Sequence, residues 1–373
     1  MDAGTIALLG AVVAFIVTLV LQRVLNPVAS RLDLMDYPNG RKDHAQPTPI
    51  IGGVAMLVGV LLAAALTLPS VPTSVLGFVA AAGLLVIVGL IDDKYDLDWR
   101  LRILAQVLAA LIMIHLGGVR VHYLGHLFGY DNVFLGSLSV PFTVFATVGI
   151  INAINMVDGM DGLAGLLVLS ALFMLSVAAV YSGNERVLSH ALIAIGAVSA
   201  FLLYNIRHPW QRCAKSFMGN AGSAFLGLTI AWIAFRLTQN PGHPVTPVLA
   251  LWMLPVPIMD CLVLIARRIK LGQSPFRADH NHIHHLMLEA GFKPTAAAIT
   301  LAAFSCACGL VAALASRAHI SHNLILGVFF VMCGVWYWLT GRRARALNFF
   351  GGAKTNKQGS RPIVNEIPQE SRR

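Results

Sequence analysis

Carboxylates in this sequence stand at the ends of apolar segments. Asp92, Asp93 and Asp96 end one apolar run, and Asp158 and Asp161 end another. A later polar stretch holds four histidines within six residues: His280, His282, His284 and His285. Acidic pairs and clustered histidines, in a chain with few other charges, predict metal-assisted chemistry on an anionic substrate at a membrane surface.

The first acidic cluster has the spacing D-D-x-x-D and follows an apolar run that ends at Ile91. At the end of a helix, positions i, i+1 and i+4 allow at least two carboxylates to converge. Their mutual repulsion would be relieved by a divalent cation, and Mg²⁺ suits an oxygen site that also holds waters and substrate phosphate. The alternative is an ordinary charged loop at the membrane interface, and the cluster alone does not separate the two.

The second constellation lies in the stretch N-A-I-N-M-V-D-G-M-D-G. Its polar members recur every three residues, so on a helix they would form one drifting stripe: Asn152, Asn155, Asp158 and Asp161. An Asp at the centre of a membrane helix costs about 2.5–3.5 kcal/mol on insertion scales. Four such residues in register therefore favour a functional site over a structural one, and Gly159 and Gly162 would let the backbone approach a ligand.

Three further features are consistent with more than one interpretation. The stretch F-M-G-N-A-G-S, from Phe217, could seat a phosphate at a helix N-terminus or could serve close helix packing. Lys42, before a Gly-Gly pair, could hold a lipid phosphate or could be an ordinary cytoplasmic cation. The histidines could bind diphosphate oxygens or sugar hydroxyls, carry protons, or form a solvated loop. Asp260, inside an apolar segment, is expected to pair with a neighbouring polar group, and Arg267 is a candidate.

The elements that must position these residues are membrane helices. The chain has 373 residues, of which 57% are hydrophobic and 12% charged, whereas soluble domains carry roughly 25% charged residues. About 20 apolar residues are needed to cross a bilayer. The sequence predicts an all-α integral membrane protein, a bundle of about eleven spans near residues 5–25, 50–68, 74–91, 101–117, 136–156, 163–182, 188–205, 221–238, 246–266, 295–315 and 323–340.

The distribution of Lys and Arg predicts the orientation. With the N-terminus outside, 23 of them fall on the inner side and four on the outer side, which indicates an N-out, C-in topology with the polar motifs at the cytoplasmic face. We expect residues 1–341 to form the polytopic domain and residues 342–373 to form a basic, disordered tail. The net charge of +10 then reflects contact with membrane lipids. The sequence has no basic stripe interleaved with aromatics, so it does not suggest nucleic-acid binding. It also has no internal repeat of the kind found in many transporters, which makes a transporter less favoured.

The motifs, taken together, resemble those of a known superfamily. G-L-I-D-D-K-Y-D, N-A-I-N-M-V-D-G-M-D-G-L, F-M-G-N-A-G-S and H-I-H-H are similar, in content and in order, to the polyprenyl-phosphate N-acetylhexosamine-1-phosphate transferases. The H-I-H-H form resembles the WecA-like branch more than the MraY branch, which has three adjacent histidines. The resemblance covers roughly residues 30–340.

The resemblance implies an enzyme of the bacterial inner membrane that acts at the cytoplasmic face. It would transfer GlcNAc-1-phosphate from UDP-GlcNAc to undecaprenyl phosphate, release UMP and require Mg²⁺, with Mn²⁺ as a substitute. Such a reaction begins the assembly of a lipid-linked surface polysaccharide, such as the O-antigen of lipopolysaccharide. The oligomeric state and the downstream glycan stay open.

Residue roles carry over from the resemblance position by position. The catalytic set would be Asp92, Asp93, Asp158 and Asp161. The metal set would be Asp92, Asp93, Asp158 and Asn220. The substrate-binding set would be Lys42, Asn155, Asn205, Phe217, His282, His284 and His285, with Phe217 stacking on uracil.

The chain departs from the family pattern at two positions. Asn220 stands where the family has a metal-binding Asp, and His280 stands where it has an Arg. An amide oxygen can still ligate a metal, but one negative charge is lost. Three functions therefore remain: the GlcNAc-1-phosphate transfer, the same reaction with another UDP-N-acetylated sugar, and a non-catalytic relative that binds lipid phosphate or UDP-sugar. Direct attack by the lipid phosphate and a two-step route through an aspartyl-phosphate are both compatible with the sequence.

Overall fold

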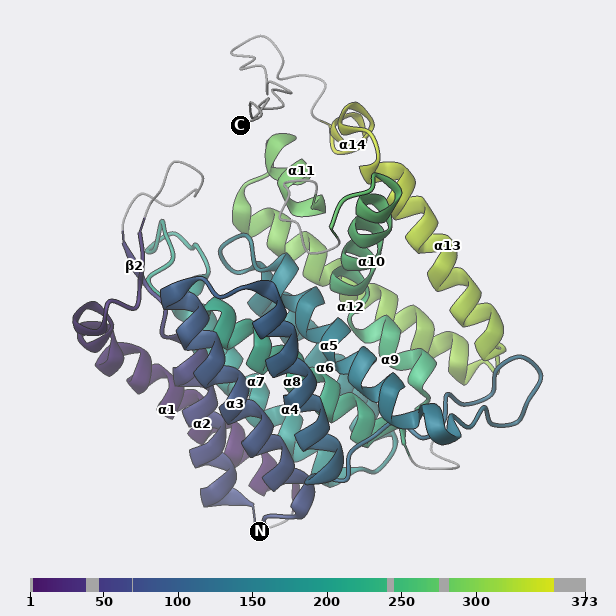
Figure 1. Ribbon diagram of the computed structural model, residues 1–373, viewed down its shortest axis with the longest axis horizontal. Helices are drawn as coiled ribbons and strands as arrows, with labels where there is room; N and C mark the ends of the chain where they lie inside the picture. Colours follow the sequence, from purple (N-terminus) through teal and green to yellow (C-terminus); the bar gives the residue numbers. More distant parts are fainter. Residues whose placement is uncertain (1–2, 38–46, 69, 240–244, 275–281, 352–373) are drawn as a thin grey trace, which may run out of the picture.

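The computed structural model describes residues 3–37, 47–68, 70–239, 245–274 and 282–351. Nearly all of their regular secondary structure is helical (Figure 1). The helices are α1 (Ala3–Leu32), α2 (Gly52–Thr67), α3 (Thr73–Tyr95), α4 (Trp99–His115), α5 (Ser139–Val157), α6 (Leu163–Tyr181), α7 (Glu185–Asn205), α8 (Gly219–Thr238), α9 (Pro247–Met253), α10 (Pro255–Lys270), α11 (Ile283–Glu289), α12 (Pro294–Arg317), α13 (His322–Thr340) and α14 (Arg343–Phe349). A 3₁₀ turn (Gly136–Leu138) precedes α5, and two-residue strands β1 (Met35–Asp36) and β2 (Thr48–Pro49) pair antiparallel.

Among the described residues, eight helices are long and apolar enough to cross a membrane, or nine if the pair α9–α10, bent by 90°, is one span. Each of the eleven predicted segments coincides with a helix or with this bent pair. The remaining two are α2, with 16 residues, and α4, with 17, which are about 24–26 Å long against roughly 30 Å of hydrocarbon. An all-helical, multi-pass membrane protein is therefore confirmed, while the count of eleven spans stays a prediction.

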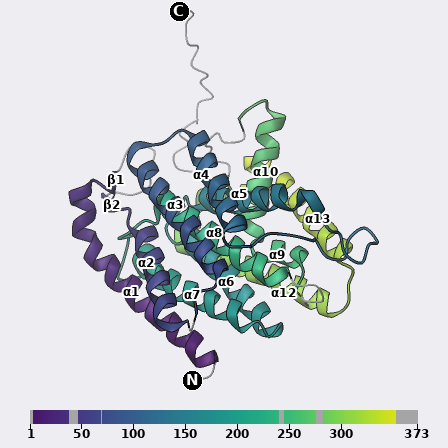
Figure 2. The same ribbon diagram turned by 60° about the horizontal axis from the view of Figure 1, so that its bottom comes forward.

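Helix α8 forms the centre of the bundle. Nearly all of its residues from Ala221 onward are buried, and α2, α3, α5, α6 and α7 surround it (Figures 1 and 2). Its apolar residues are distributed on every side, as expected for a helix that contacts protein all round rather than lipid on one face. The first turn of α8 carries Asn220, so the most enclosed helix of the protein begins at a candidate site residue.

Glycines bring neighbouring helices into backbone contact at this end of α8. A Cβ atom at Gly89 of α3 would overlap the Cα atom of Ala221, and one at Gly53 of α2 would overlap the backbone of Gly222. Small residues serve close helix approach in membrane proteins, where dispersion contacts replace the hydrophobic effect as the source of association. The close approach places the end of α3, with its acidic cluster, against the start of α8.

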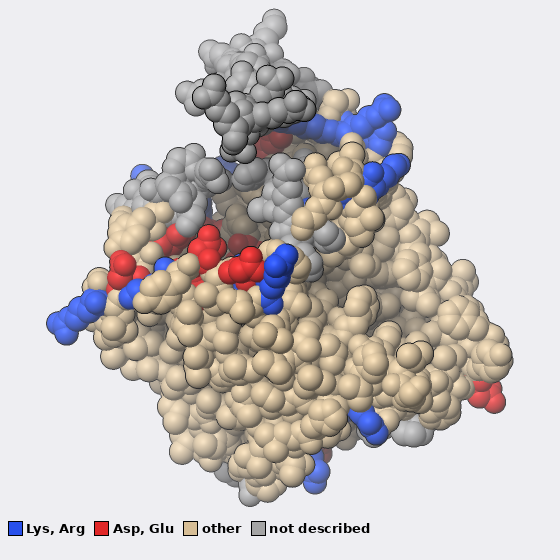
Figure 3. Space-filling model, in the orientation of Figure 1, with Lys and Arg blue, Asp and Glu red and all other residues tan. Residues whose placement is uncertain are grey.

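Charged side chains gather toward one end of the molecule. On the face shown in Figure 3, acidic residues form a row at the left, along the upper edge of a broad surface nearly free of charge. The short helices α11 and α14 lie toward the same end in Figure 1 and contact each other. The expected tail thus begins with a helix, α14, whose Arg343 forms an ion pair with Glu289 of α11. Residues 352–373 of that tail lie outside the described residues.

The glycine contact predicts a position-specific sensitivity. Gly89→Ala should separate α3 from α8 and lower the free energy of unfolding by about 1–3 kcal/mol, the usual cost of overpacking. Gly83→Ala, on the same helix, meets nothing within 4 Å and should leave stability unchanged or slightly raised. Thermal unfolding of the two purified variants in detergent measures the difference. Equal melting temperatures would contradict the assigned contact.

Candidate functional site

A cavity of about 360 Å³ lies between α3, α4, α5, α8 and α10, beside the start of α11. Its walls combine apolar side chains, such as Leu85 and Ile151, with polar ones from every predicted motif. The polar members are Asp92, Arg102, Gln106, Asn152, Asn155, Asn220, Arg268, His282 and His285. Residues up to 193 positions apart in the sequence therefore converge on one cavity that has both apolar and charged walls.

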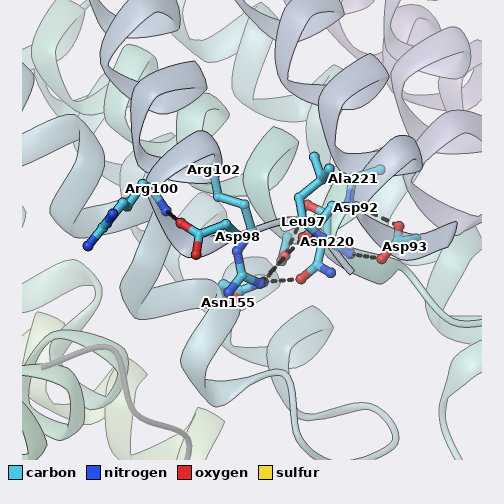
Figure 4. A network of polar contacts seen from close by, with 10 residues as sticks. Asp92, Asp93, Leu97, Asp98, Arg100, Arg102, Asn155, Asn220 and Ala221 are labelled. Carbon is cyan, nitrogen blue, oxygen red and sulfur yellow. Dashed lines mark hydrogen bonds and ion pairs between the residues drawn. The ribbon is translucent and has the colours of Figure 1, made fainter. Parts of the chain in front are cut away.

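Asp92 is a buried carboxylate at the end of α3. Its Oδ1 atom accepts a hydrogen bond from the backbone N–H of Leu97 at 2.8 Å, and its Oδ2 atom pairs with Arg102 of α4 at 3.4 Å (Figure 4). The first bond is possible because Asp96 adopts a left-handed conformation (φ 50°), which turns the chain back toward α3. Local backbone geometry and one cation thus hold this carboxylate at the cavity wall.

Asp93 caps the start of α8. Its Oδ1 accepts from the backbone N–H of Asn220 at 2.7 Å and its Oδ2 from that of Ala221 at 3.3 Å (Figure 4). A carboxylate is favourable there because the free N–H groups and the helix dipole are positive. The sequence raised a phosphate seat at this helix end as one interpretation. In the structure these two N–H groups bind Asp93 instead.

Asn155 joins α5 to α8. Its amide nitrogen donates to the Oδ1 of Asn220 at 2.8 Å and to the Oγ of Ser223 at 2.9 Å. The amide oxygen of Asn220 is therefore oriented by Asn155, and it keeps a second lone pair for another partner. These contacts place two of the candidate residues, one for substrate and one for metal, side by side at the cavity.

The prediction of one helical polar stripe from Asn152 to Asp161 is wrong beyond α5, which ends at Val157. Asn152 donates to Gln106 of α4 at 2.6 Å, inside the bundle. Asp161 lies in the following loop and accepts from the Nε of Arg207 at 2.6 Å. Gly162 lies directly before α6 and takes a left-handed conformation (φ 82°) that other residues rarely adopt, so the chain turns between α5 and α6 instead of continuing one helix.

Asp158 stands directly after α5 and is half-buried. Burial, together with the negative charges of Asp93 and Asp161, raises the pKa of its carboxyl group to about 7. Because the charge of Asp93 affects the pKa of Asp158, the two acidic motifs lie near each other although they are far apart in the sequence. A positive charge beside them would be strongly favourable.

Asn205 and Asp161 connect the loop after α5 to the loop between α7 and α8, and neither residue lines the cavity. Asn205 accepts from the N–H of Gly162 at 2.8 Å and donates to the carbonyl of Ser216 at 2.9 Å, while Asp161 also accepts from the N–H of Ala214 at 3.2 Å. Phe217 is fixed by backbone bonds to Pro49 and Gly52. The roles expected for Asn205, Asp161 and Phe217 in substrate binding and catalysis stay predictions, but each residue has a defined place.

The histidine motif lies against the second acidic loop. His282 and His284 are buried, and His282 and His285 line the cavity. The rings of His284 and His285 are 4.1 Å apart, centroid to centroid. A Cβ atom at Gly159 would lie 2.8 Å from the Nε2 of His284, so the glycine permits this approach. Lys42 and His280 lie outside the described residues.

Asp260 has polar partners, as expected, but the candidate partner Arg267 is wrong. Asp260 binds His282 and Trp336, at 2.7 and 3.1 Å, whereas Arg267 donates to Thr340 and to the carbonyl of Tyr337. Asp260 and Arg267 are seven positions apart, about two turns of α10, and each turns toward a different neighbour. Sequence reasoning also missed Arg102, Arg268 and Gln106 as cavity residues. Their only signal was a charge or amide in or beside an apolar segment.

Comparison with known proteins identifies the family. Residues 75–238 match the model of glycosyl transferase family 4. A curated protein of Yersinia pestis is 33% identical over 321 residues, which cover 86% of this chain and 87% of that protein. The chain belongs to glycosyl transferase family 4.

The Yersinia pestis protein is named undecaprenyl-phosphate alpha-N-acetylglucosaminyl 1-phosphate transferase, and further relatives share this name. The protein of Haemophilus influenzae is 36% identical over 314 residues, which cover 83% of this chain and 87% of that protein. The protein of Escherichia coli K12 is 32% identical over 322 residues, covering 85% of this chain and 86% of that protein. The resemblance seen in the motifs is confirmed, and this chain is a membrane transferase of the family.

The ion pair of Asp161 predicts a local effect on stability. Arg207→Ala leaves a nearly buried carboxylate without its cation and should lower the free energy of unfolding by about 1.5–3 kcal/mol. Proteolytic cleavage in the loop 206–218 should become faster at the same time. Arg212→Ala, an exposed position of the same loop, is the control and should change neither measurement. Equal cleavage rates for both variants would contradict this role of Arg207.

Proposed function

We propose that this protein transfers GlcNAc-1-phosphate from UDP-GlcNAc to undecaprenyl phosphate and releases UMP. The observation that carries the proposal is the convergence of Asp92, Asn155, Asn220, His282 and His285 on one cavity. The three relatives above are 33%, 36% and 32% identical to this chain over most of its length, and all three are named for this lipid and this sugar. A polyprenyl phosphate needs apolar walls and a UDP-sugar needs polar ones, and the cavity offers both.

The donor set fits a divalent cation such as Mg²⁺, or Mn²⁺ in its place. Asp92, Asp93, Asp158 and the amide oxygen of Asn220 would hold it, because they are oxygen ligands of the kind that Mg²⁺ prefers. The raised pKa of Asp158 supports this assignment, since neighbouring carboxylates that repel one another favour a cation between them. When bound, the cation supplies charge neutralisation of the diphosphate and polarises its phosphorus atom.

The chain's own residues would perform the remaining tasks. Arg102 and Arg268, at the cavity wall, would attract the phosphate groups of both substrates, which otherwise repel each other. The histidines would donate to diphosphate oxygens, and Phe217 would stack on uracil. Asp92 would orient the lipid phosphate for in-line attack. A covalent aspartyl-phosphate route needs the same residues, and a labelled phospho-enzyme formed without lipid acceptor would distinguish it.

We further propose eleven spans, N-out and C-in, in the bacterial inner membrane, with the site at the cytoplasmic face. The excess of Lys and Arg on one side of the predicted topology supports this orientation. The short helices α2 and α4 would complete the count. Helix α2 packs against α8 and helix α4 packs against α3, so these longer neighbours would shield the ends of the short helices.

The direct test is transfer of radiolabel. Membranes that contain the protein, given UDP-[¹⁴C]GlcNAc, undecaprenyl phosphate and Mg²⁺, should produce butanol-extractable label that mild acid releases as a sugar phosphate. Asp158→Asn should abolish this transfer, because it removes a carboxylate from the cation site. Label from another UDP-N-acetylated sugar alone would change the assigned donor. Retained UDP-sugar binding with no transfer from any donor would indicate a binding relative.

The amide at position 220 generates a second test. Asn220→Asp keeps the acceptor for Asn155 and adds one negative charge, so half-saturation should need about five- to tenfold less Mg²⁺, equivalent to about 1–1.4 kcal/mol. The measurement is transfer activity against Mg²⁺ concentration. Asn152→Asp adds the same charge elsewhere in the cavity and serves as the control. An equal shift in both variants would contradict a specific contact between residue 220 and the cation.

A further inference from the structure

Asp260 is the most deeply buried carboxylate of the described chain outside the acidic motifs. It lies on α10, is 1% exposed and has three hydrogen-bond donors around it. The Nδ1 of His282 lies 2.7 Å from its Oδ2, and the Nε1 of Trp336 lies 3.1 Å from its Oδ1. The backbone N–H of Ile283 is a longer contact at 3.4 Å. The reaction described above assigns Asp260 no task.

The contact with Asp260 determines which ring nitrogen of His282 carries a proton in their hydrogen bond. An ionised carboxylate only accepts, so the Nδ1 of His282 must be the donor in their bond. The Nε2 atom is the ring's second nitrogen, and His282 lines the same cavity as Asp92 and Asn155. A ring protonated on both nitrogens could donate to Asp260 on one side and to a bound anion on the other. The buried carboxylate would balance the positive charge of that ring.

Helix α11 does not fix His282 by itself. His282 precedes α11 with extended backbone angles (φ −65°, ψ 148°), and no side-chain hydrogen bond caps this helix, which has only seven residues. Asp260 on α10 and Trp336 on α13 therefore provide a rigid external support. Catalytic and binding histidines commonly depend on such a partner for ring orientation.

We propose that Asp260 is a positioning residue that holds His282 as a doubly protonated donor toward the diphosphate of the sugar nucleotide. This inference rests on the proposed function, because it requires a diphosphate in the cavity. Asp260 itself touches no substrate. Its carboxylate acts through the ring of His282.

A metal ion is the alternative occupant of the same place. Ligand atoms of Asp260, His282 and His284 all lie within 4.8 Å of one another. The 2.7 Å contact between His282 and Asp260 favours a shared proton over a shared ion, because a metal would take the lone pair that this proton occupies. Elemental analysis of the purified protein distinguishes the two, and about one bound zinc ion per chain would overturn the proposal.

The main test is a double-mutant cycle on the purified full-length enzyme. Asp260→Asn keeps the shape of the side chain but removes the counter-charge, and it should raise the KM for UDP-GlcNAc by 10- to 100-fold, about the usual effect of such outer partners. The KM for undecaprenyl phosphate should change less than twofold. In a His282→Ala background, Asp260→Asn should cause no further loss, because Asp260 acts through that ring. Full additivity of the two losses would overturn the proposal.

Thr340→Val is the matched control. It breaks another contact between α10 and α13, the bond from Arg267, without touching His282. It should leave both KM values within twofold of the wild type, with all variants checked by thermal unfolding. A rise in the KM for UDP-GlcNAc equal to that of Asp260→Asn would mean that Asp260 acts only in helix packing, which would overturn the proposal.

The two proposals can fail separately. No transfer by the wild-type enzyme from any UDP-sugar would overturn the proposed function, whereas wild-type transfer with an unchanged Asp260→Asn variant would overturn only this inference.

Discussion

The cost of burying negative charge in an apolar protein determines the organisation of this structure. An isolated carboxylate in a low-dielectric interior is strongly unfavourable unless donors or cations surround it. Each buried carboxylate here has such partners: Leu97 and Arg102 for Asp92, two α8 N–H groups for Asp93, Arg207 and Ala214 for Asp161, and His282 and Trp336 for Asp260. Of these partners, Arg102 and His282 also line the cavity, so the same contacts that stabilise buried charge shape part of its wall.

Helix packing and charge stabilisation depend on the same residues. Gly53 and Gly89 let α2 and α3 reach the backbone of α8, and only this approach brings Asp93 to the N–H groups of Asn220 and Ala221. Asp93 then stabilises the start of the most enclosed helix. The acidic motif of α3 therefore has a role in folding, through the contacts of Asp93 with α8, as well as a candidate role in the chemistry.

The sequence predicted the helical class, the location of every apolar segment and the convergence of the motifs, because hydrophobic length and motif order are local properties. It did not predict which carboxylate meets which partner. The three-residue spacing from Asn152 to Asp161 suggested one helical stripe, but α5 ends at Val157, in the middle of that stretch. Arg267 was the candidate partner of Asp260, yet Asp260 binds residues 22 and 76 positions away. Such pairings depend on tertiary packing, which spacing does not encode.

The carboxylates differ in how much of their bonding capacity remains for a ligand. Asp93, Asp161 and Asp260 each accept at least two hydrogen bonds from the protein. Asp158 lies beyond the end of α5, with its pKa raised by burial and by neighbouring negative charge, so it gains most from a cation. Asp92 has one backbone donor, one longer contact to Arg102 and a place on the cavity wall. Asp92 and Asp158 are therefore the better placed to give oxygen atoms to a bound ligand, and the hydrogen bonds of Asp93, Asp161 and Asp260 hold the surrounding helices and loops together.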